Sequence, residues 1–378
     1  MAEPDFPETE FEERLTRAQR AMRSAELDAL FFTTEAELRY FTGFRTLFWQ
    51  SPTRPWFLVV PVSGKPIAII PQIGAHLMAA TWIDDIRTFA APHPTDDGIS
   101  LLADCLSRFS RVGMPMGRES TLRMPLRDFR ELTTRLSHLE FVDASDLMLR
   151  LRMVKSEREI ALLRQICGIG SAGFANAARL FQEGQTLKEV FRTFRIELLR
   201  QGADDVPYLV GGAGQGGYGD VISPPTDQQL EKGDVLMLDT GATKNGYFCD
   251  FDRNFAFGVA TDAVRVAHEK LVLAVEAAAA VARPGRTCAD LFSAMTAVLD
   301  QDDGDVGRLG HGLGMQLTEM PSVTGFDTTG LQENMVMTLE PSIDLGNGKM
   351  MVHEENIVVR DGPPEFLSTP APKEIPVI

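Results

Sequence analysis

Two short segments with the pattern of tight β-hairpins constrain this chain more than any other feature. In the first, Asp234 to Gly258, two apolar strands flank Asn245-Gly246, a residue pair preferred in two-residue hairpin turns. A four-residue loop would put Asp239 opposite Asp250, whereas a two-residue loop would put it opposite Asp252. Either register sets one aspartate against another, which destabilises a sheet. A positive charge is therefore expected between them.

The second segment, Met335 to Val359, repeats the arrangement with glutamates. Its turn is centred on Gly346-Asn347-Gly348, and Glu340 and Glu354 are equidistant from Asn347. The two carboxylates should therefore face each other across the hairpin. Solvated edge charge could explain one such pair. Two pairs in mostly apolar strands instead indicate a site that needs several carboxylates together.

A histidine set among glycines joins these carboxylates. His311 lies in the segment GHGLGMQLTE, where bare backbone on both sides would let the chain pass close to a crowded centre. A buried histidine satisfied by a hydrogen bond is the commoner situation in proteins. Four carboxylates and one imidazole, however, form a hard, oxygen-rich site for divalent metal. Because four carboxylates exceed the charge of one dication, we expect two ions.

Charge and cysteine usage limit the partners and the compartment. The formal net charge of −16 argues against nucleic acid and anionic membrane surfaces, which need a basic footprint. No apolar run reaches membrane-spanning length, and the acidic N-terminal segment lacks the apolar region of a secretory signal. The four cysteines form no CxxC pair, which is typical of reduced thiols. We therefore expect a cytoplasmic protein with no nucleic-acid or membrane partner.

The pattern of apolar residues changes near residue 150 and predicts two domains, residues 1–150 and residues 151–378. The first alternates helical stretches with short apolar strands such as DALFFTT and WFLVVPVSGKPIAIIP, which predicts a mixed sheet with covering helices. The second contains four long helices, two of which begin with a capping box, the first formed by Ser156 and Glu159. Strand pairs with Asn-Gly turns lie between and after these helices. This order predicts helices packed on an antiparallel sheet, of the α+β class.

Several of these motifs resemble those of the M24 metallopeptidases, the family with the pita-bread fold of methionine aminopeptidase, aminopeptidase P and prolidase. The similar segments are LDTGATKNGYFCDFDR, GHGLG, MTLEPS and HEENIVV. LRYFTGF in the first half and RMVKSEREI at the boundary are similar to the two-domain branch, which contains prolidase, aminopeptidase P and creatinase. The resemblance implies an α+β protein in which an N-terminal creatinase-like α/β domain is followed by a C-terminal catalytic pita-bread domain.

Carried over to this sequence, the resemblance implies five metal ligands and one catalytic residue. Asp239 would chelate one ion, His311 and Glu340 would hold the other, and Asp250 and Glu354 would bridge the two. In the family the position of Glu340 also transfers protons beside the metal-bound water.

The implied activity is that of a dinuclear metal hydrolase, in the simplest case an Xaa-Pro dipeptidase. Two divalent ions about 3.5–4 Å apart lower the pKa of a water between them and polarise a carbonyl, and a nearby carboxylate moves the proton. Mn²⁺, Co²⁺, Zn²⁺ and Fe²⁺ all suit such ligands, so the identity of the metal stays open.

The sequence departs from the peptidases of this family on the substrate side. They usually carry a second histidine in an HE pair after the ligand histidine, where this chain has Thr318-Glu319, and a further one upstream, whereas residues 211–234 contain none. A threonine hydroxyl can donate a hydrogen bond but cannot shuttle a proton near neutral pH. Two alternatives therefore stand beside the dipeptidase. One is a C–N hydrolase or lyase acting on a small osmolyte-like molecule, and the other is a non-catalytic binding protein.

Contacts with a dipeptide or another small-molecule substrate are predicted from position alone. Tyr218, in the glycine-rich GGYGD, is one candidate, and a tyrosine that merely packs a loop is the alternative. The segment Phe48 to Phe57 is unusually aromatic for a loop. In two-domain relatives the N-terminal domain leans over a neighbouring subunit's active site. Trp49, Arg54 and Trp56 could therefore line a substrate pocket or form a contact of a homodimer.

Three further charged or titratable residues are close to the expected ligands in the sequence. Asp252 stands where the family often has threonine, and Arg253 is expected to be its ion-pair partner or to support the ligands from behind. His353 is adjacent to Glu354 and is expected to point to the opposite face of its strand.

Overall fold

The computed structural model describes residues 6–51, 54–301 and 307–378. The chain divides into two compact units, Met1–Arg152 and Met153–Ile378. Among the described residues, no helix is both long and apolar enough to cross a membrane.

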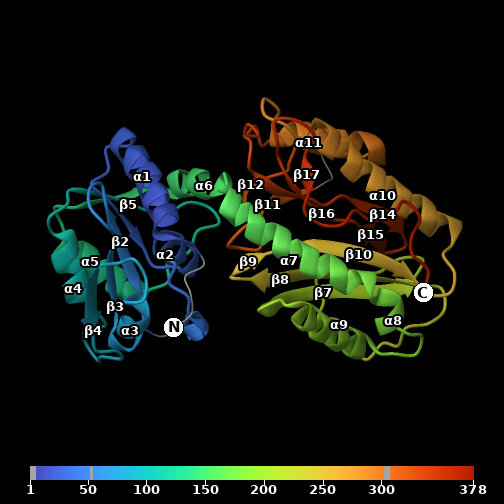
Figure 1. The fold of residues 1–378 in the computed structure, drawn as a ribbon, viewed down its shortest axis with the longest axis horizontal. Coiled ribbons are helices and arrows are strands. Elements are labelled where there is room, and N and C mark those ends of the chain that lie inside the picture. Colours follow the sequence, from blue (N-terminus) through green and yellow to red (C-terminus); the bar gives the residue numbers. More distant parts are fainter. Residues whose placement is uncertain (1–5, 52–53, 302–306) are drawn as a thin grey trace. The chain divides into compact units, whose positions relative to one another are not determined.

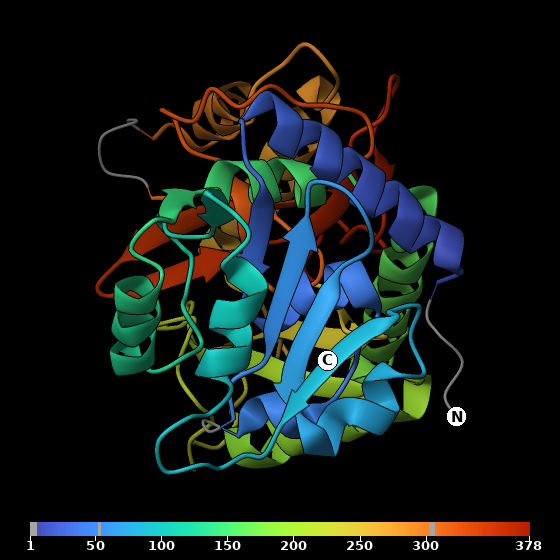
Figure 2. The ribbon, with the colours of Figure 1, turned by 90° about the vertical axis from the view of Figure 1, so that its left-hand side faces the viewer.

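The N-terminal unit is built on one sheet with the strand order β4-β3-β2-β1-β5-β6 (Figures 1 and 2). β1 runs antiparallel to β2 and parallel to β5, so the sheet is mixed, as predicted. The strands are β1 (Ala29–Phe32), β2 (Phe57–Pro61), β3 (Ile67–Pro71), β4 (Asp85–Phe89), β5 (Arg111–Met114) and β6 (Glu140–Asp143). The helices are α1 (Glu8–Ser24), α2 (Glu35–Thr42), α3 (Ala75–Met78), α4 (Ile99–Leu106), α5 (Leu126–Arg135) and α6 (Ser145–Met153), with short 3-10 turns η1 (Leu47–Gln50) and η2 (Gln72–Gly74).

Side chains of this sheet alternate between two apolar layers. Phe31 belongs to a buried cluster with Leu102 of α4 and Leu132 of α5. The neighbouring Phe32 stacks on Phe41 of α2, with 5.5 Å between the ring centroids. The uninterrupted apolar run of β1 is therefore explained by burial on both faces of the sheet.

The C-terminal unit combines long helices with antiparallel sheets (Figure 1). One sheet has the order β10-β8-β7, with β9 paired to β8, and the other has the order β12-β11-β13-β16-β17, while β14 and β15 form a hairpin. The helices are α7 (Glu157–Ala175), α8 (Ala177–Leu180), α9 (Leu187–Gln201), α10 (Asp262–Val281) and α11 (Cys288–Leu299). The strands are β7 (Asp205–Gln215), β8 (Asp234–Lys244), β9 (Tyr247–Phe248), β10 (Phe251–Ala256), β11 (His311–Gly312), β12 (Glu319–Ser322), β13 (Val336–Leu339), β14 (Ser342–Gly346), β15 (Lys349–Val352), β16 (Glu355–Val358) and β17 (Glu365–Phe366).

Local signals fix where the helices of this unit begin. Both predicted capping boxes are present: the hydroxyl of Ser156 accepts the N–H of Glu159 at the start of α7, and Thr186 does the same for Glu189 at the start of α9. The long helix predicted after Ser156 is interrupted, however, because Asn176 leaves helical geometry and separates α7 from α8.

Helices cover one face of the β10-β8-β7 sheet and thereby define its other face. Phe251 and Phe255 of β10 pack on Phe174 of α7, with ring centroids 5.5 and 6.3 Å apart. Alternate residues of a strand point to opposite faces, so Asp252 points away from α7. Helices α10 and α11 lie side by side (Figure 1) and share an apolar core with β13 and β15.

Candidate metal centre

The first hairpin adopts the shorter of the two loops that the sequence leaves open. Its turn is the pair Asn245-Gly246, whose φ angles of 45° and 61° suit a two-residue turn. In the same register, Asp239 stands opposite Asp252. Asp250 precedes Asp252 by two residues, just before β10 begins. It therefore lies diagonally across from Asp239, within reach of it.

The second hairpin keeps the predicted symmetry about Asn347. The β13–β16 and β14–β15 ladders share one register on either side of the point where Glu340 meets Glu354. The two carboxylates therefore stand directly opposite each other, as their spacing predicts. Near the turn the register shifts by one residue. The chain reverses direction at Asn347 and Gly348, which have φ angles of 54° and 70°.

His311 lies in β11, a two-residue strand between β12 and β13. Gly310 has a φ of 139°, and a Cβ there would lie 2.2 Å from the carbonyl oxygen of Thr338. A Cβ on Gly312 would lie 2.4 Å from the carbonyl oxygen of Met320. The glycines are therefore required by close backbone packing around His311.

The tautomer of His311 follows from its hydrogen bond. Nδ1 lies 2.8 Å from the carbonyl oxygen of Gly312. Because a carbonyl oxygen can only accept, Nδ1 carries the proton, and the lone pair of Nε2 is left for a ligand. Nε2 lies 3.3 Å from Oδ2 of Asp250.

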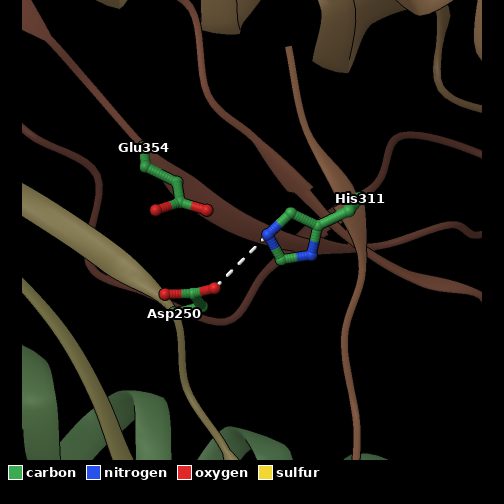
Figure 3. Close-up of side chains that lie close together, drawn as sticks. All are labelled: Asp250, His311 and Glu354. Carbon is green, nitrogen blue, oxygen red and sulfur yellow. Dashed lines mark ion pairs between the residues drawn. The ribbon is translucent and has the colours of Figure 1, made fainter. Parts of the chain in front are cut away.

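Three of the predicted ligands converge in the structure. Asp250, His311 and Glu354 each offer one ligand atom within 4.8 Å of the other two (Figure 3). All three side chains are buried, and they come from the segment before β10, from β11 and from the segment before β16. Asp239, which lies diagonally across from Asp250, and Glu340, which stands opposite Glu354, complete what we call the ligand cluster: Asp239, Asp250, His311, Glu340 and Glu354.

Among the described residues, no lysine or arginine forms an ion pair with the carboxylates of the ligand cluster, and Arg308 acts on Asp250 and Glu340 only from a distance. Burial raises the pKa of all four, and neighbouring carboxylates raise it further. Oδ1 of Asp239 and Oε1 of Glu354 are buried without a hydrogen-bond partner among the described residues. Burial also lowers the pKa of His311, which keeps the imidazole neutral. Unpaired buried charge is costly, and divalent cations would neutralise these carboxylates and occupy the free oxygens. The five side chains therefore fit a metal centre.

Tyr208 is a site residue that sequence reasoning missed. It is half-buried on β7, where it pairs with Gly241 of β8, and its hydroxyl acts to lower the pKa of Asp239. Burial and the four carboxylates raise the pKa of Tyr208 well above its ordinary value. A Cβ on Gly241 would lie 3.0 Å from Cβ of Tyr208 and 2.3 Å from Cδ1 of Leu317. The sequence does contain one indication of this contact. Gly241 lies inside an apolar strand, where a glycine indicates that another group approaches the backbone closely.

Two of the predicted substrate contacts are wrong. Tyr218 is fully buried; its hydroxyl lies 3.0 Å from Oδ1 of Asn254 and accepts the N–H of Val352 at 2.7 Å, so it packs the loop. Trp56 is 1% exposed and packs against Phe44 inside the N-terminal unit. Neither ring is available to a ligand.

The other predicted substrate contacts remain accessible. Thr318 is half-buried just before β12, next to the Leu317 that approaches Gly241. Trp49 and Arg54 are half-buried in the N-terminal unit, where Arg54 lies over the ring of Phe48 at 5.1 Å. A role in substrate binding stays a prediction for these three residues.

Arg253 does not form the expected ion pair with the side chain of Asp252. Its guanidinium pairs instead with Glu355 at 2.9 Å and donates to the backbone carbonyl of Asp252. His353 lies between the carboxylates of Asp252 and Glu355, 3.3 Å from each. Arg253 and Asp252 also contact the backbone of Glu354.

Comparisons with known proteins give the same picture of the chain. The model of the metallopeptidase family M24 matches residues 161–361, and that of the creatinase/prolidase N-terminal domain matches residues 14–154. The probable dipeptidase PepE of Mycobacterium tuberculosis is 27% identical over 378 residues, which span 96% of this chain and 96% of that protein. The Xaa-Pro dipeptidase of Pyrococcus horikoshii is 27% identical over 260 residues, spanning 67% of this chain and 73% of that protein. The crystal structure of dipeptidase PepE from Mycobacterium ulcerans has a TM-score of 0.85 and 25% identity, covering 98% of this chain and 99% of that one.

Proposed function

The chain belongs to the metallopeptidase family M24, with a creatinase/prolidase N-terminal domain ahead of the peptidase domain, and on this premise we propose that it is a dinuclear metal hydrolase that cleaves Xaa-Pro dipeptides. The observation that carries the proposal is the buried group of Asp250, His311 and Glu354, whose ligand atoms lie within 4.8 Å of one another. Relatives named as dipeptidases align over nearly the whole chain, which supports a small peptide substrate.

Within the proposal, all five members of the ligand cluster hold metal. Asp239 would bind one ion, His311 and Glu340 the other, and Asp250 and Glu354 both. The diagonal placement of Asp239 and Asp250, the facing pair of Glu340 and Glu354, and the unpartnered oxygens of Asp239 and Glu354 support this assignment. When bound, such ions polarise the scissile carbonyl and favour attack by water. Mn²⁺, Co²⁺, Zn²⁺ and Fe²⁺ are all compatible with one imidazole and four carboxylates.

Glu340 is the residue that we assign to proton transfer. Its side chain is only half-buried, so it can meet both water and substrate. Burial raises its pKa, which brings a carboxyl group nearer to the pH at which it can both accept and donate a proton. Glu340 would take the proton of the attacking water and deliver it to the departing amide nitrogen. Tyr208, through its hydroxyl, would hold Asp239 in place.

Arg308 supports a substrate that carries a carboxylate. It is exposed, and it forms no hydrogen bond or ion pair with any residue in the described ranges. The carbonyl oxygen of the adjacent Leu309 accepts the N–H of Glu340 at 2.9 Å, and the Arg308 guanidinium acts to lower the pKa of Asp250 and Glu340. A free guanidinium beside the metal centre could bind the terminal carboxylate of a dipeptide.

One observation favours a second candidate function. Thr318 occupies the place of a peptidase histidine, and residues 211–234 contain no histidine. The alternative is therefore C–N hydrolysis or lyase action on a small osmolyte-like molecule at the same metal centre. A purely non-catalytic binding protein is disfavoured by the complete set of ligands.

Metal analysis combined with a substrate screen tests the proposal. We expect close to two divalent ions per chain and hydrolysis of at least some Xaa-Pro dipeptides by the manganese-loaded protein. Turnover of a small cyclic or acylated amide, with no dipeptide cleaved, would replace the first function with the second. A protein that holds no divalent ion and turns over neither class would contradict both.

The proposal also includes the oligomeric state of the protein and its cellular compartment. Leu47, next to the aromatic segment of the N-terminal unit, is 81% exposed, which supports a contact surface and a homodimer. All four cysteines are buried and free, which supports a reducing compartment and hence the cytoplasm. Sedimentation of only monomer at micromolar concentration would contradict the dimer.

A further inference from the structure

Four more buried ionisable residues lie next to the ligand cluster in the chain, and the proposed chemistry does not use them. They are Asp252, Arg253, His353 and Glu355, each at most 8% exposed, and we call them the paired cluster. The first two belong to β10, and the others lie at the start of β16. Charged side chains are rarely buried unless they are paired, so their presence calls for a physical reason.

Asp252 holds the main chain at a proposed metal ligand. Its Oδ1 accepts the N–H of Glu354 at 3.0 Å and lies 3.3 Å from Nδ1 of His353. Its Oδ2 is buried with no hydrogen-bond partner in the part of the chain that the structure describes. Because Asp252 also stands opposite Asp239, its carboxylate shares the face that carries the ligands.

His353 connects Asp252 to a fixed support. Its Nε2 lies 3.3 Å from Oε1 of Glu355, and Glu355 in turn accepts from Arg253 at 2.9 Å. Each ring nitrogen of His353 thus faces a carboxylate oxygen. A continuous row of contacts leads from Arg253 through Glu355, His353 and Asp252 to the backbone of Glu354.

We propose that Asp252 and His353 are positioning residues of the metal centre: Asp252 fixes the backbone of Glu354, and His353 fixes Asp252. The inference rests on the proposed function to the extent that Glu354 is a metal ligand. Replacing a residue that orients a ligand typically weakens metal binding by about 10–100-fold. A residue that serves folding alone would lower stability and leave the metal affinity of the folded protein unchanged.

The two residues depend on each other. Threonine, which often occupies the position of Asp252 in the family, could accept the Glu354 N–H but offers no negative charge to a histidine. Buried ion pairs also add little stability compared with well-packed apolar residues of similar volume. Positioning therefore explains the pair of Asp252 and His353 better than stability does.

The test is a Mn²⁺ titration of the full-length protein after its metal has been removed with a chelator. Asp252→Asn keeps the size and removes the charge, and His353→Gln keeps a single donor. Asp234→Asn is the matched control, because Asp234 is 3% exposed, lies on β8 and accepts from Gln215 outside both clusters. We expect the first two variants to bind Mn²⁺ about 10–100-fold more weakly than wild type, with the control close to wild type.

The outcomes separate this inference from the proposed function. Affinities of Asp252→Asn and His353→Gln that match the control would overturn the inference and leave the proposed function intact, even if the thermal stability of both metal-free variants fell. A wild-type protein that binds no divalent ion would overturn both. If Asp252→Asn does not fold, the affinity of His353→Gln decides.

Discussion

The ligand cluster and the paired cluster are formed by neighbouring positions of the same segments. They differ in whether a cationic side chain pairs with their buried carboxylates. In the paired cluster, burial acts to raise the pKa of Glu355, but Arg253 and His353 lower it to about 2. In the ligand cluster, no lysine or arginine of the described ranges forms an ion pair with a carboxylate, and the pKa of each of the four carboxylates is raised. Burial alone therefore does not mark a functional site. Buried carboxylates without an ion-pair partner indicate such a site, because a cation from outside the chain would neutralise their charge.

The largest expected effect comes from neutralising one carboxylate of the ligand cluster. Glu340→Gln should preserve the fold and lower turnover of a true substrate by at least about 10²-fold, the low end of what general acid–base catalysis contributes. Steady-state kinetics with the manganese-loaded protein measures this. Glu333→Gln, at an exposed position on the same segment, is the control and should retain wild-type turnover.

Removing metal should affect stability through the ligand cluster alone. Chelation should lower the free energy of unfolding by about 4 kcal/mol relative to protein holding metal at 1,000 times its dissociation constant. Thermal unfolding with a chelator and then with added Mn²⁺ measures the difference. A melting temperature that responds to neither addition would show that the ligand cluster is stable without a cation.

In the metal-free protein, the ligand-cluster carboxylates and Glu355 of the paired cluster should respond to pH in opposite directions. The ligand-cluster carboxylates have folded-state pKa values above the ordinary 3.8 and 4.5, so the folded state binds more protons and stability should fall as the pH rises from about 4. The folded-state pKa of Glu355 is about 2. Its ionised form therefore stabilises the folded state above about pH 4.5, and this stabilisation is lost as the pH falls through 2.

Thermal unfolding of chelated protein across the acidic and neutral range measures both trends. Added Mn²⁺ should remove the loss of stability toward neutral pH, because a bound cation replaces the protons. A metal-free protein that becomes steadily more stable up to neutral pH would mean that burial and mutual repulsion of the ligand-cluster carboxylates do not destabilise the folded state.

The smallest expected effect concerns the substrate side. Thr318→His should raise activity on an Xaa-Pro dipeptide by up to about fivefold, which corresponds to one added hydrogen bond of about 1 kcal/mol. If the pocket is instead built for another small molecule, the substitution should give no gain on dipeptides and should impair the natural reaction. Parallel assays on both substrate classes distinguish these results.

Much of the site could be predicted because its spacing is tied to turns. The equal distance of Glu340 and Glu354 from Asn347 gave the correct pairing, and Asn245-Gly246 limited Asp239 to two partners. The resemblance to M24 metallopeptidases and the expected order of a creatinase-like domain before the peptidase domain are confirmed by the family models. Hairpin geometry is local, and local geometry is what a sequence pattern encodes most directly.

Residues whose environment comes from distant segments could not be predicted. Tyr208 reaches Asp239 only because β7 pairs with β8. Tyr218 looked accessible in a glycine-rich loop, but the backbone of Val352 covers its hydroxyl. Arg253 was expected to pair with Asp252 or to support the ligands from behind; its ion-pair partner Glu355 lies 102 residues away, and it also donates to the backbone carbonyl of Glu354. Tertiary contacts at such separations leave no periodic signal in the sequence.

The tight backbone around His311 has an evolutionary consequence. Gly310 and Gly312 are held by carbonyl oxygens of β12 and β13, which lie within 2.4 Å of where a side chain would begin. These two glycines would therefore be retained even in related chains that had lost every proposed metal ligand. In a saturation mutagenesis scored for folding alone, both glycines should be intolerant, while the ligand carboxylates should tolerate neutral substitutions. Retained glycines in a diverged relative thus report an inherited scaffold, and only the four carboxylates and the imidazole report retained chemistry.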